Sequence, residues 1–464
     1  MKILAPFILG FNYFVGIYYG LFNAIYSILL CLSLIVILIY IKRLKYAPIK
    51  EIALSPETPP VSILIAAYNE KEVILRTLES VFSINYPFYD VIVINDGSED
   101  GTLELLIKRF NLKRIDMVYR QILKTADVKG FYYNEDIPNL LVIDKVRGGK
   151  ADALNCGINM SRSPYVCTFD ADSVLEPDAI IRLMIPVIES PVPVVACGGV
   201  VRILNGSKTD HGTVSEIRLP EKRLVIFQIV EYLRAFLFGR VGWDTIHSTV
   251  ILSGTFTLFN KATLIKVGGF HTRHLAEDMD IIVKLHKYHL KNKLSYRIKF
   301  ISDPICWTEV PEDLKSLGRQ RRRWHMGLIQ SLIEHKEMIF NPTYGRLGLF
   351  VFPYYLFFEM LGPVIEFAGY IVVPLSYLVG LLSTEYFILF LTLAIVYGIL
   401  LSTTGIFLEE FTYKRYPGWT HLFTLLIYGI LENLGYRQIN SFWRLQATIL
   451  YMCGRKKWEY VRQG

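Results

Sequence analysis

Hydrophobic residues concentrate at the two ends of this 464-residue chain. No side chain is charged over residues 3–41, and from residue 347 onward long apolar runs return with few interruptions. The middle of the chain carries an ordinary mixture of apolar and polar residues. Because a membrane span needs about 20 apolar residues, the pattern predicts a membrane segment over 1–50, a soluble domain over 51–345 and interfacial and transmembrane helices over 346–464.

The N-terminal apolar stretch is predicted to stay on the protein, because it lacks the basic start and small-residue cleavage site of a signal peptide. One crossing over about residues 21–41 is favoured. The preceding residues include Asn12, Tyr13, Tyr18 and Tyr19, which are typical of a membrane interface. A short hairpin with two crossings is the alternative.

Two further stretches, residues 361–382 and 386–408, have spanning length. Thr384 and Glu385 lie between them and mark the turn of a predicted helical hairpin. Glu366 falls inside the first stretch, where a carboxylate is unfavourable unless it faces protein or a polar path. It therefore either forms a structural hydrogen bond or lines a path for a polar product.

The remaining C-terminal segments are harder to assign. Residues 347–358 are short and aromatic, which favours an interfacial helix. Residues 421–434 and 442–453 are ambiguous. Since the basic residues at 414–415 and 455–457 prefer the cytoplasm, the chain between them is expected to cross the membrane twice or not at all.

The formal net charge of +8 does not indicate a nucleic-acid partner, because the basic residues are not interleaved with aromatics along one run. They cluster beside apolar segments, at residues 42–50 and 455–457. This places the soluble domain in the cytosol and the protein in the cell's plasma membrane. The six cysteines are scattered without paired spacing, which argues against disulfides and a zinc site.

Short β-branched runs alternate with helical patterns through the middle of the chain. Helices are predicted over 71–83 and 102–109, and strands over 61–66, 90–94, 140–143, 165–169 and 194–202. Alternation of this kind predicts a doubly wound, mainly parallel α/β sheet. Ligands of such sheets bind beyond the carboxyl ends of the strands.

Familiar nucleotide-binding signatures are absent from these strand ends. No G-x-G-x-x-G opens a helix, and Gly149-Lys150 lacks the P-loop pattern because Asp144 and Ala151 stand where that pattern needs Gly and Ser or Thr. Dinucleotide and ATP sites are therefore not favoured.

The strand ends carry acids instead. Asp96 follows one strand, and Asp170 and Asp172 follow another. Taken singly, each acid also fits a turn or a helix cap. Carboxylates cannot hold a diphosphate without a bridging cation, so a phosphate ligand here requires Mg²⁺ or Mn²⁺.

Six ordered blocks carry a family resemblance: residues 61–70 (VSILIAAYNE), 93–98 (VINDGS), 149–155 (GKADALN), 170–172 (DAD), 276–278 (AED) and 320–324 (QRRRW). The chain resembles the inverting family-2 glycosyltransferases, in particular the membrane-integrated branch with cellulose, chitin, hyaluronan and poly-N-acetylglucosamine synthases. The resemblance covers about residues 55–345. It implies a GT-A-type, Rossmann-like domain flanked by transmembrane helices.

The resemblance also implies roles. Asp278, paired with Glu277, is the expected general base, and Asp170 and Asp172 are the expected metal ligands. The UDP-sugar is expected to contact Ala67, Tyr68, Asn69, Glu70, Asp96, Lys150, Asn155 and Asp170. The acceptor and the diphosphate are expected to contact Gln320, Arg323 and Trp324, since an indole stacks on a sugar ring and a guanidinium stabilises phosphate.

Some residues depart from the family pattern or stay without a role. Ala276 replaces the more usual Thr before Glu-Asp. Residues 205–220 are polar and are expected to form a flexible loop. Arg321 and Arg322 fit a basic helix at the membrane surface. The histidines expected to be structural or solvent-facing are His247, His271 and His274.

Three functions are weighed. The leading one is a processive β-glycan synthase that adds a hexose or N-acetylhexosamine from a UDP-sugar to a growing polysaccharide in contact with membrane lipid. The first alternative transfers one sugar to a lipid acceptor. The second alternative is a catalytically inert membrane scaffold or accessory subunit, and the presence of all four proposed carboxylates argues against it. Whether the enzyme needs an accessory subunit of its own is not decided by the sequence.

Overall fold

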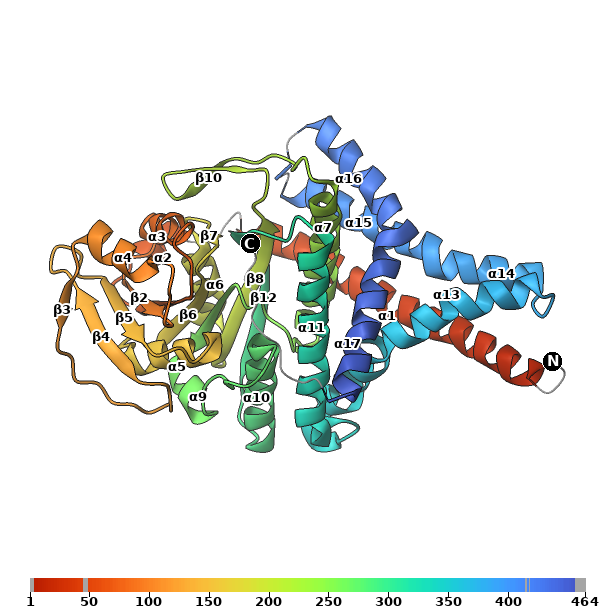
Figure 1. The fold of residues 1–464 in the computed structure, drawn as a ribbon, viewed down its shortest axis with the longest axis horizontal. Coiled ribbons are helices and arrows are strands. Elements are labelled where there is room, and N and C mark those ends of the chain that lie inside the picture. The colour runs from red at the N-terminus through yellow and green to blue at the C-terminus, as the bar shows by residue number, and fades with distance from the viewer. Residues whose placement is uncertain (1–3, 45–48, 414, 417, 455–464) are drawn as a thin grey trace. The chain divides into compact units, whose positions relative to one another are not determined.

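The computed structural model describes residues 4–44, 49–413, 415–416 and 418–454 (Figure 1). Lys45, Lys414 and residues 455–457, on which part of the topology argument rests, lie outside the described residues. All six cysteines are described and free, as predicted.

The chain forms two compact units. The first, here called the sheet unit, comprises Tyr40–Arg218 and Thr249–Glu309. The second, the helical unit, comprises Met1–Ile39, Leu219–Ser248 and Val310–Gly464. The predicted domain boundaries near residues 50 and 345 stay a prediction.

A ten-stranded sheet forms the core of the sheet unit, in the order β3-β4-β5-β2-β1-β6-β11-β8-β12-β7. Its four neighbouring strands β5, β2, β1 and β6 run parallel. All five predicted strands are confirmed, and their bounds are β1 Val61–Ala67, β2 Tyr89–Asn95, β5 Leu140–Lys145, β6 Tyr165–Asp170 and β8 Val194–Ile203. β1 is buried along nearly its whole length, as its apolar run requires.

The sheet is mixed, because antiparallel strands extend the parallel part on both sides. β11 (Phe256–Asn260) runs antiparallel between β6 and β8. β4 (Val128–Tyr133) and β3 (Lys113–Ile115) form the opposite edge. The other strands are β7 Val174–Leu175 and β12 Arg297–Thr308.

Helices cover both faces of the sheet. Figure 1 shows α3 (Ile74–Phe82) and α4 (Thr102–Phe110) on one side of the strands and α5 (Lys150–Met160) on the other. The two predicted helices are α3 and α4, so both are confirmed. The other helices of this unit are α2 Ile49–Leu54, α6 Ala179–Glu189, α9 Lys261–Lys266 and α10 Glu277–Lys291.

Residues 205–220 were expected to be a flexible loop, and this prediction is wrong. They contain a β-hairpin of β9 (Lys208–Asp210) and β10 (Thr213–Glu216). Its turn packs on α3, where a Cβ added to Gly212 would lie 2.4 Å from the backbone carbonyl of Glu79. Gly212 also has φ +76°, which favours glycine.

In the helical unit, α1 is one continuous helix from Ala5 to Leu44. The alternative hairpin with two crossings is therefore wrong, and the interfacial position of the residues before 21 stays a prediction. The first turns pack against later helices: Asn12 Nδ2 donates to Ser376 Oγ at 3.0 Å, and Asn23 Nδ2 donates to the Leu393 carbonyl at 2.9 Å. The amide N–H groups of these two asparagines thus find acceptors within the protein.

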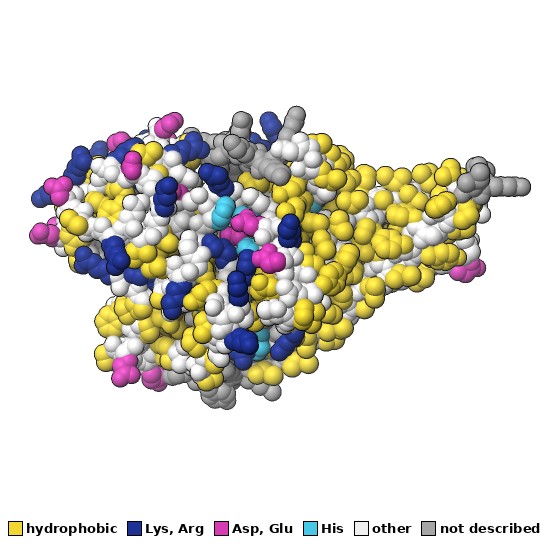
Figure 2. Space-filling view, turned by 90° about the horizontal axis from the view of Figure 1, so that it is seen from below, with side chains coloured by type: hydrophobic (Ala, Val, Ile, Leu, Met, Phe, Trp, Pro, Cys, Tyr) yellow, Lys and Arg dark blue, Asp and Glu magenta, His cyan; other side chains and the backbone are white. Residues whose placement is uncertain are grey.

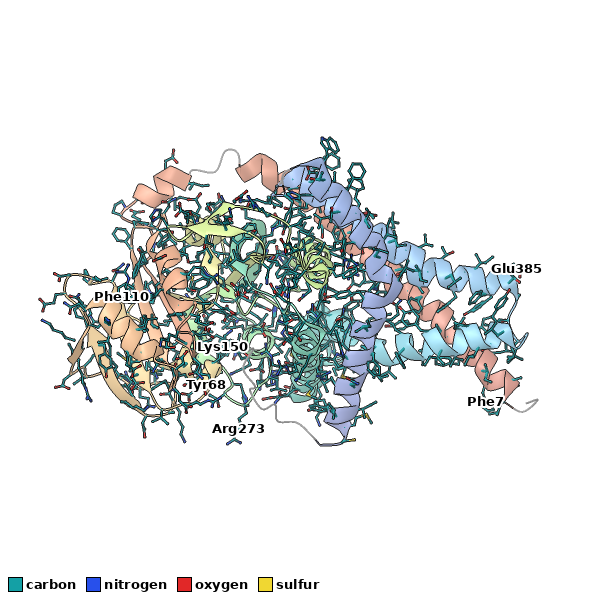
Figure 3. The ribbon with its side chains drawn as sticks, turned by 45° about the horizontal axis from the view of Figure 1, so that its top comes forward. Phe7, Tyr68, Phe110, Lys150, Arg273 and Glu385 are labelled. Atoms are coloured by element: carbon teal, nitrogen blue, oxygen red, sulfur yellow. The ribbon has the colours of Figure 1, made fainter. Side chains whose placement is uncertain are left out.

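The predicted hairpin consists of α13 (Gly362–Leu378) and a helical stretch that begins with α14 (Thr384–Leu391). Glu385 lies at its tip (Figure 3). Glu366 accepts a 2.8 Å hydrogen bond from Ser441, which agrees with the structural alternative. The other helices are α7 Arg223–Arg234, α8 Val241–Thr245, α11 Leu314–Glu334, α12 Phe352–Tyr354, α15 Tyr397–Thr412, α16 Trp419–Leu431 and α17 Arg437–Met452.

Within the part of the chain that the structure describes, two helices are long and apolar enough to cross a membrane, Ala5–Ile39 and Thr384–Thr412. A third candidate is the pair Leu347–Met360 and Gly362–Leu378, which is bent by 43°. Figure 2 shows hydrophobic side chains dominating the surface of the helical unit, whereas charged side chains gather over the sheet unit. These features indicate a membrane protein.

Candidate active site

The carboxyl ends of β1 and β2 carry two loops that hold each other. The backbone N–H of Asn69 donates to Ser98 Oγ at 3.0 Å, and that of Glu99 donates to Asn69 Oδ1 at 2.8 Å. Glu70 N–H donates to Thr102 Oγ1 at 3.0 Å. Asn69 adopts φ +58°, a left-handed conformation that asparagine tolerates. The predicted block Ala67–Glu70 is therefore fixed beside the loop that contains Asp96.

Asp96 is buried and holds the loop after β5. Its Oδ1 accepts from Lys145 Nζ at 2.6 Å and from Gly148 N–H at 2.9 Å, and its Oδ2 accepts from Gly149 N–H at 2.7 Å. A carboxylate offers about four acceptor positions, so these donors use three. Asp96 thus orients the loop that leads into Lys150.

The same loop closes over Tyr68. The guanidinium of Arg147 lies over the Tyr68 ring, 4.0 Å from its centroid. Gly97, with φ +71°, allows this approach, since a Cβ there would lie 3.1 Å from the backbone nitrogen of Arg147. Tyr68 and Lys150 both lie in the sheet unit in Figure 3.

Lys150 connects the acids of β6 and α10. Its Nζ pairs with Asp170 Oδ1, lies 3.6 Å from Glu277 Oε1 and donates to the Gly254 carbonyl at 3.2 Å. Burial by itself would lower the pKa of Lys150, but Asp170, Glu277 and Asp278 outweigh it and raise the pKa above its ordinary value. Lys150 is therefore a fixed cation among carboxylates.

Asp172 lies two residues beyond Asp170. Burial, followed by repulsion from Asp170, raises the pKa of Asp172 to about 6. Ser173 Oγ donates to its Oδ1 at 3.1 Å and partly offsets this effect. The pair thus carries concentrated negative charge, and its oxygen donors fit a hard divalent cation.

Glu277 and Asp278 form the first turn of α10, where the helix dipole stabilises anions. Asp278 Oδ1 accepts from the Met279 N–H at 2.9 Å. The carboxylate also lies against Gly254, since a Cβ at that position would be 3.1 Å from Asp278 Oδ2. The absence of a side chain at Gly254 therefore makes room for Asp278.

These residues line one hollow of about 260 Å³, its open mouth included. Lys150, Glu277 and Asp278 form its charged side, and Ser253, Gly254, Thr168 and Thr257 add polar atoms. The apolar lining consists of Leu154, Leu252, Phe259 and Phe270. We refer to it as the Asp278 hollow.

Asn155 acts on the wall of this hollow. Its Nδ2 donates to the Phe270 carbonyl at 2.8 Å, and its Oδ1 accepts from the Phe270 N–H at 2.8 Å. The Asn155 amide therefore positions Phe270, and its contact with a donor sugar stays a prediction.

Gln320, Arg323 and Trp324 lie on α11, in the helical unit. Trp324 is 40% exposed. The structure therefore places the acids and Lys150 together in the sheet unit, and the Gln320–Trp324 block on a separate unit.

Sequence reasoning missed the roles of Lys145 and Asp152. Lys145 Nζ contacts Asp152 Oδ1 at 2.6 Å as well as Asp96, and its side chain is fully buried. Lys145 stands at the end of an apolar strand, and lysine is rarely buried without a charged partner. This position could therefore have indicated a buried ion pair.

Two models of known protein families match this chain, and both describe family-2 glycosyl transferases. The model of "Glycosyl transferase family 2" matches residues 62–267, and that of "Glycosyl transferase family group 2" matches residues 165–431, more than half of the chain. A mannosyltransferase structure from Pyrobaculum calidifontis, in complex with GDP-Man and Mn²⁺, aligns with a TM-score of 0.50 at 20% identity, over 89% of this chain and 99% of that one. That likeness supports the GT-A-type fold.

Two curated relatives are poly-beta-1,6-N-acetyl-D-glucosamine synthases. The one from Staphylococcus epidermidis is 31% identical over 309 residues, which are 66% of this chain and 61% of the relative. The one from Staphylococcus aureus (strain COL) is 30% identical over 308 residues, 66% of this chain and 62% of the relative. The chain thus spans less than two thirds of the length of these relatives.

Proposed function

Because the chain belongs to glycosyl transferase family group 2, we propose that it is an inverting membrane glycosyltransferase that extends a polysaccharide from a UDP-sugar. The observation that carries this proposal is Lys150, which lines the Asp278 hollow and pairs with carboxylates from β6 and α10. Because both relatives are poly-beta-1,6-N-acetyl-D-glucosamine synthases, an N-acetylhexosamine is the first donor to test.

Asp278 is the proposed general base. A sugar hydroxyl is a weak nucleophile at neutral pH, so its proton must leave as the oxygen attacks the anomeric carbon. Asp278 is held by the Met279 N–H and by close packing on Gly254, which fixes the direction of its carboxylate. The glycosidic bond forms as the bond to the diphosphate breaks, in one displacement that inverts the anomeric centre.

Lys150 and Asp96 are the proposed donor-side residues. Lys150 supplies positive charge where the leaving diphosphate gains negative charge. Asp96 keeps one acceptor position beyond its three described donors, which suits an N–H of the uracil ring. Tyr68, Asn69 and Glu70 complete the proposed nucleoside site.

Asp170 and Asp172 are the proposed ligands of a divalent cation, Mg²⁺ or Mn²⁺. The fit rests on two neighbouring carboxylates that offer oxygen donors to a cation: burial, and after it repulsion from Asp170, raises the pKa of Asp172 to about 6. A bound cation would neutralise the diphosphate as it leaves.

The proposed acceptor contacts are Trp324, through its exposed ring, and Gln320 and Arg323. We also propose that the catalytic domain faces the cytosol, where nucleotide sugars are made. The candidate spans and the basic flanks at residues 42–50 support this orientation.

The test incubates purified full-length protein with a panel of UDP-sugars and Mg²⁺ or Mn²⁺, and then sizes the products. A ladder supports polysaccharide extension, whereas a single glycolipid supports transfer of one sugar to lipid. No UDP release with any donor would refute the enzymatic proposal. Asp278→Asn is expected to keep UDP binding and abolish transfer, and full activity in that variant would remove the base assignment.

A further inference from the structure

Arg321, inside the Gln320–Trp324 block, is buried in the helical unit. Its side chain is 5% exposed, and its Nη2 donates to Glu231 Oε2 at 2.7 Å. Its guanidinium lies over the ring of Trp324, with Cζ 4.5 Å from the ring centroid. The expectation that Arg321 belongs to a membrane-surface face is therefore wrong. The adjacent Arg322 is partly exposed and bonds Gln446.

Glu231 holds Arg321 together with a third segment of the chain. The same Oε2 atom accepts from the Tyr436 hydroxyl at 2.7 Å. Tyr436 follows a backbone break at Leu434 and Gly435 and stacks on Phe227, with ring centroids 5.0 Å apart. Glu231 on α7, Arg321 on α11 and Tyr436, which directly precedes α17, therefore meet at one carboxylate.

The helix that carries Trp324, α11, also packs against α17. A Cβ added to Gly318 would lie 2.8 Å from the indole of Trp443 on α17, so the two helices approach closely. Gly318 lies three residues before Arg321, about one helical turn away. α11 therefore packs closely against α17 about two turns before Trp324.

We propose that Arg321, held by Glu231 and Tyr436, is a positioning residue that fixes the indole of Trp324 for stacking on a sugar ring of the acceptor. The proposal rests on the proposed function, in which Trp324 contacts the acceptor. An exposed indole populates several rotamers, and only some of them can stack on a sugar ring. The population in the other rotamers lowers the affinity for the acceptor. A cation over the ring restricts it, and the ion pair with Glu231 keeps that cation in place.

The test uses the full chain in lipid nanodiscs, UDP-N-acetylglucosamine as donor and a β-1,6-linked N-acetylglucosamine oligomer as acceptor. The variants are Arg321→Met, Trp324→Phe, the double variant and the matched control Arg322→Met. Arg321→Met is expected to raise the acceptor KM about 10-fold, since a cation–π contact contributes roughly that factor. The Kd for UDP should not change, and Arg322→Met should stay within about 2-fold of wild type.

The double variant separates positioning from general damage. If Arg321 acts through Trp324, the double variant has the acceptor KM of Trp324→Phe; if the two effects multiply, the proposal is overturned. If Arg321→Met does not fold, Glu231→Gln and Tyr436→Phe weaken the same network more mildly and should raise the acceptor KM in the same direction.

A binding-independent readout distinguishes this proposal from the proposed function. The emission of Trp324, obtained as wild type minus Trp324→Phe, should become more accessible to acrylamide in Arg321→Met. Unchanged quenching would overturn the positioning role even in an active enzyme. Absence of UDP release from the wild type would instead refute the proposed function.

Discussion

Lys145 Nζ lies 2.6 Å from Asp96 Oδ1, and the side chains of both residues are almost completely buried. The same ammonium contacts Asp152 Oδ1 at 2.6 Å. Asp152 in turn accepts from the Ala126 N–H at 3.1 Å. One buried cation therefore connects the end of β2, the end of β5, helix α5 and the 120s loop.

Lys145→Met should destabilise the sheet unit by about 3–5 kcal/mol, because it leaves two buried carboxylates without their cation. Thermal unfolding of the purified protein measures this effect. Adding Asp152→Asn should recover part of the loss, since it removes one of the two charges. Lys129→Met, at an exposed lysine, is the matched control and should change stability by less than about 0.5 kcal/mol. A stable Lys145→Met variant would contradict the cation's structural role.

Gly254→Ala should reduce transfer while leaving UDP affinity unchanged. The added methyl would lie 3.1 Å from Asp278 Oδ2, so the carboxylate must shift. A shift of a few tenths of an ångström relieves this contact. Since a misplacement of about 1 Å can lower the rate about 100-fold, we expect a smaller loss than that. Steady-state kinetics and UDP titration separate the two effects. Gly239→Ala, where a Cβ meets nothing within 4 Å, is the control. A weaker UDP affinity in Gly254→Ala would point to a donor-side role instead.

Acid should destabilise the sheet unit through His286 on α10. Burial lowers the pKa of His286 to about 4 from its ordinary value of 6.5. As pH falls below 6.5, His286 therefore becomes protonated in the unfolded chain but stays neutral in the folded protein. The stability is fully present above pH 6.5 and declines down to pH 4, by about 3 kcal/mol.

Melting temperatures between pH 7.5 and 4.5 test this loss. The neutral ring suits its contacts, because one nitrogen lies 2.7 Å from the Thr249 carbonyl and the other 2.6 Å from the Tyr296 hydroxyl. His286→Gln should therefore show a shallower pH dependence than wild type. An identical slope in both proteins would assign the acid sensitivity to other groups.

The sequence predicted best those features that depend on local pattern. β1 and β6 were identified because apolar β-branched runs end at polar motifs, and the motif order located Asp170 and Asp278. β11 was missed because its position between β6 and β8 depends on a non-local antiparallel pairing that no local periodicity encodes.

Burial of individual charges was equally hard to predict. Arg321 and Arg322 are adjacent and identical in type, yet Arg321 is buried against Glu231, whereas Arg322 is partly exposed and bonds Gln446. The amide of Asn155 bonds the backbone of Phe270, more than 100 residues away, a contact that the sequence did not predict. Such partners follow from the fold and not from the neighbouring sequence.

Removal of divalent cations should abolish transfer, and Mg²⁺ or Mn²⁺ should restore it. Asp170 and Asp172 provide the oxygen donors, and Asp172, whose pKa is raised to about 6, is expected to bind the cation less well as pH falls below that value. Asp172→Asn should raise the Mn²⁺ concentration needed for half-maximal activity at least 10-fold, because it removes one of two anionic ligands. Asp136→Asn, at an exposed acid of the same unit, should leave that concentration unchanged. Titration of activity with Mn²⁺ after EDTA treatment makes the comparison, and full activity in EDTA would show that Lys150 alone neutralises the leaving diphosphate.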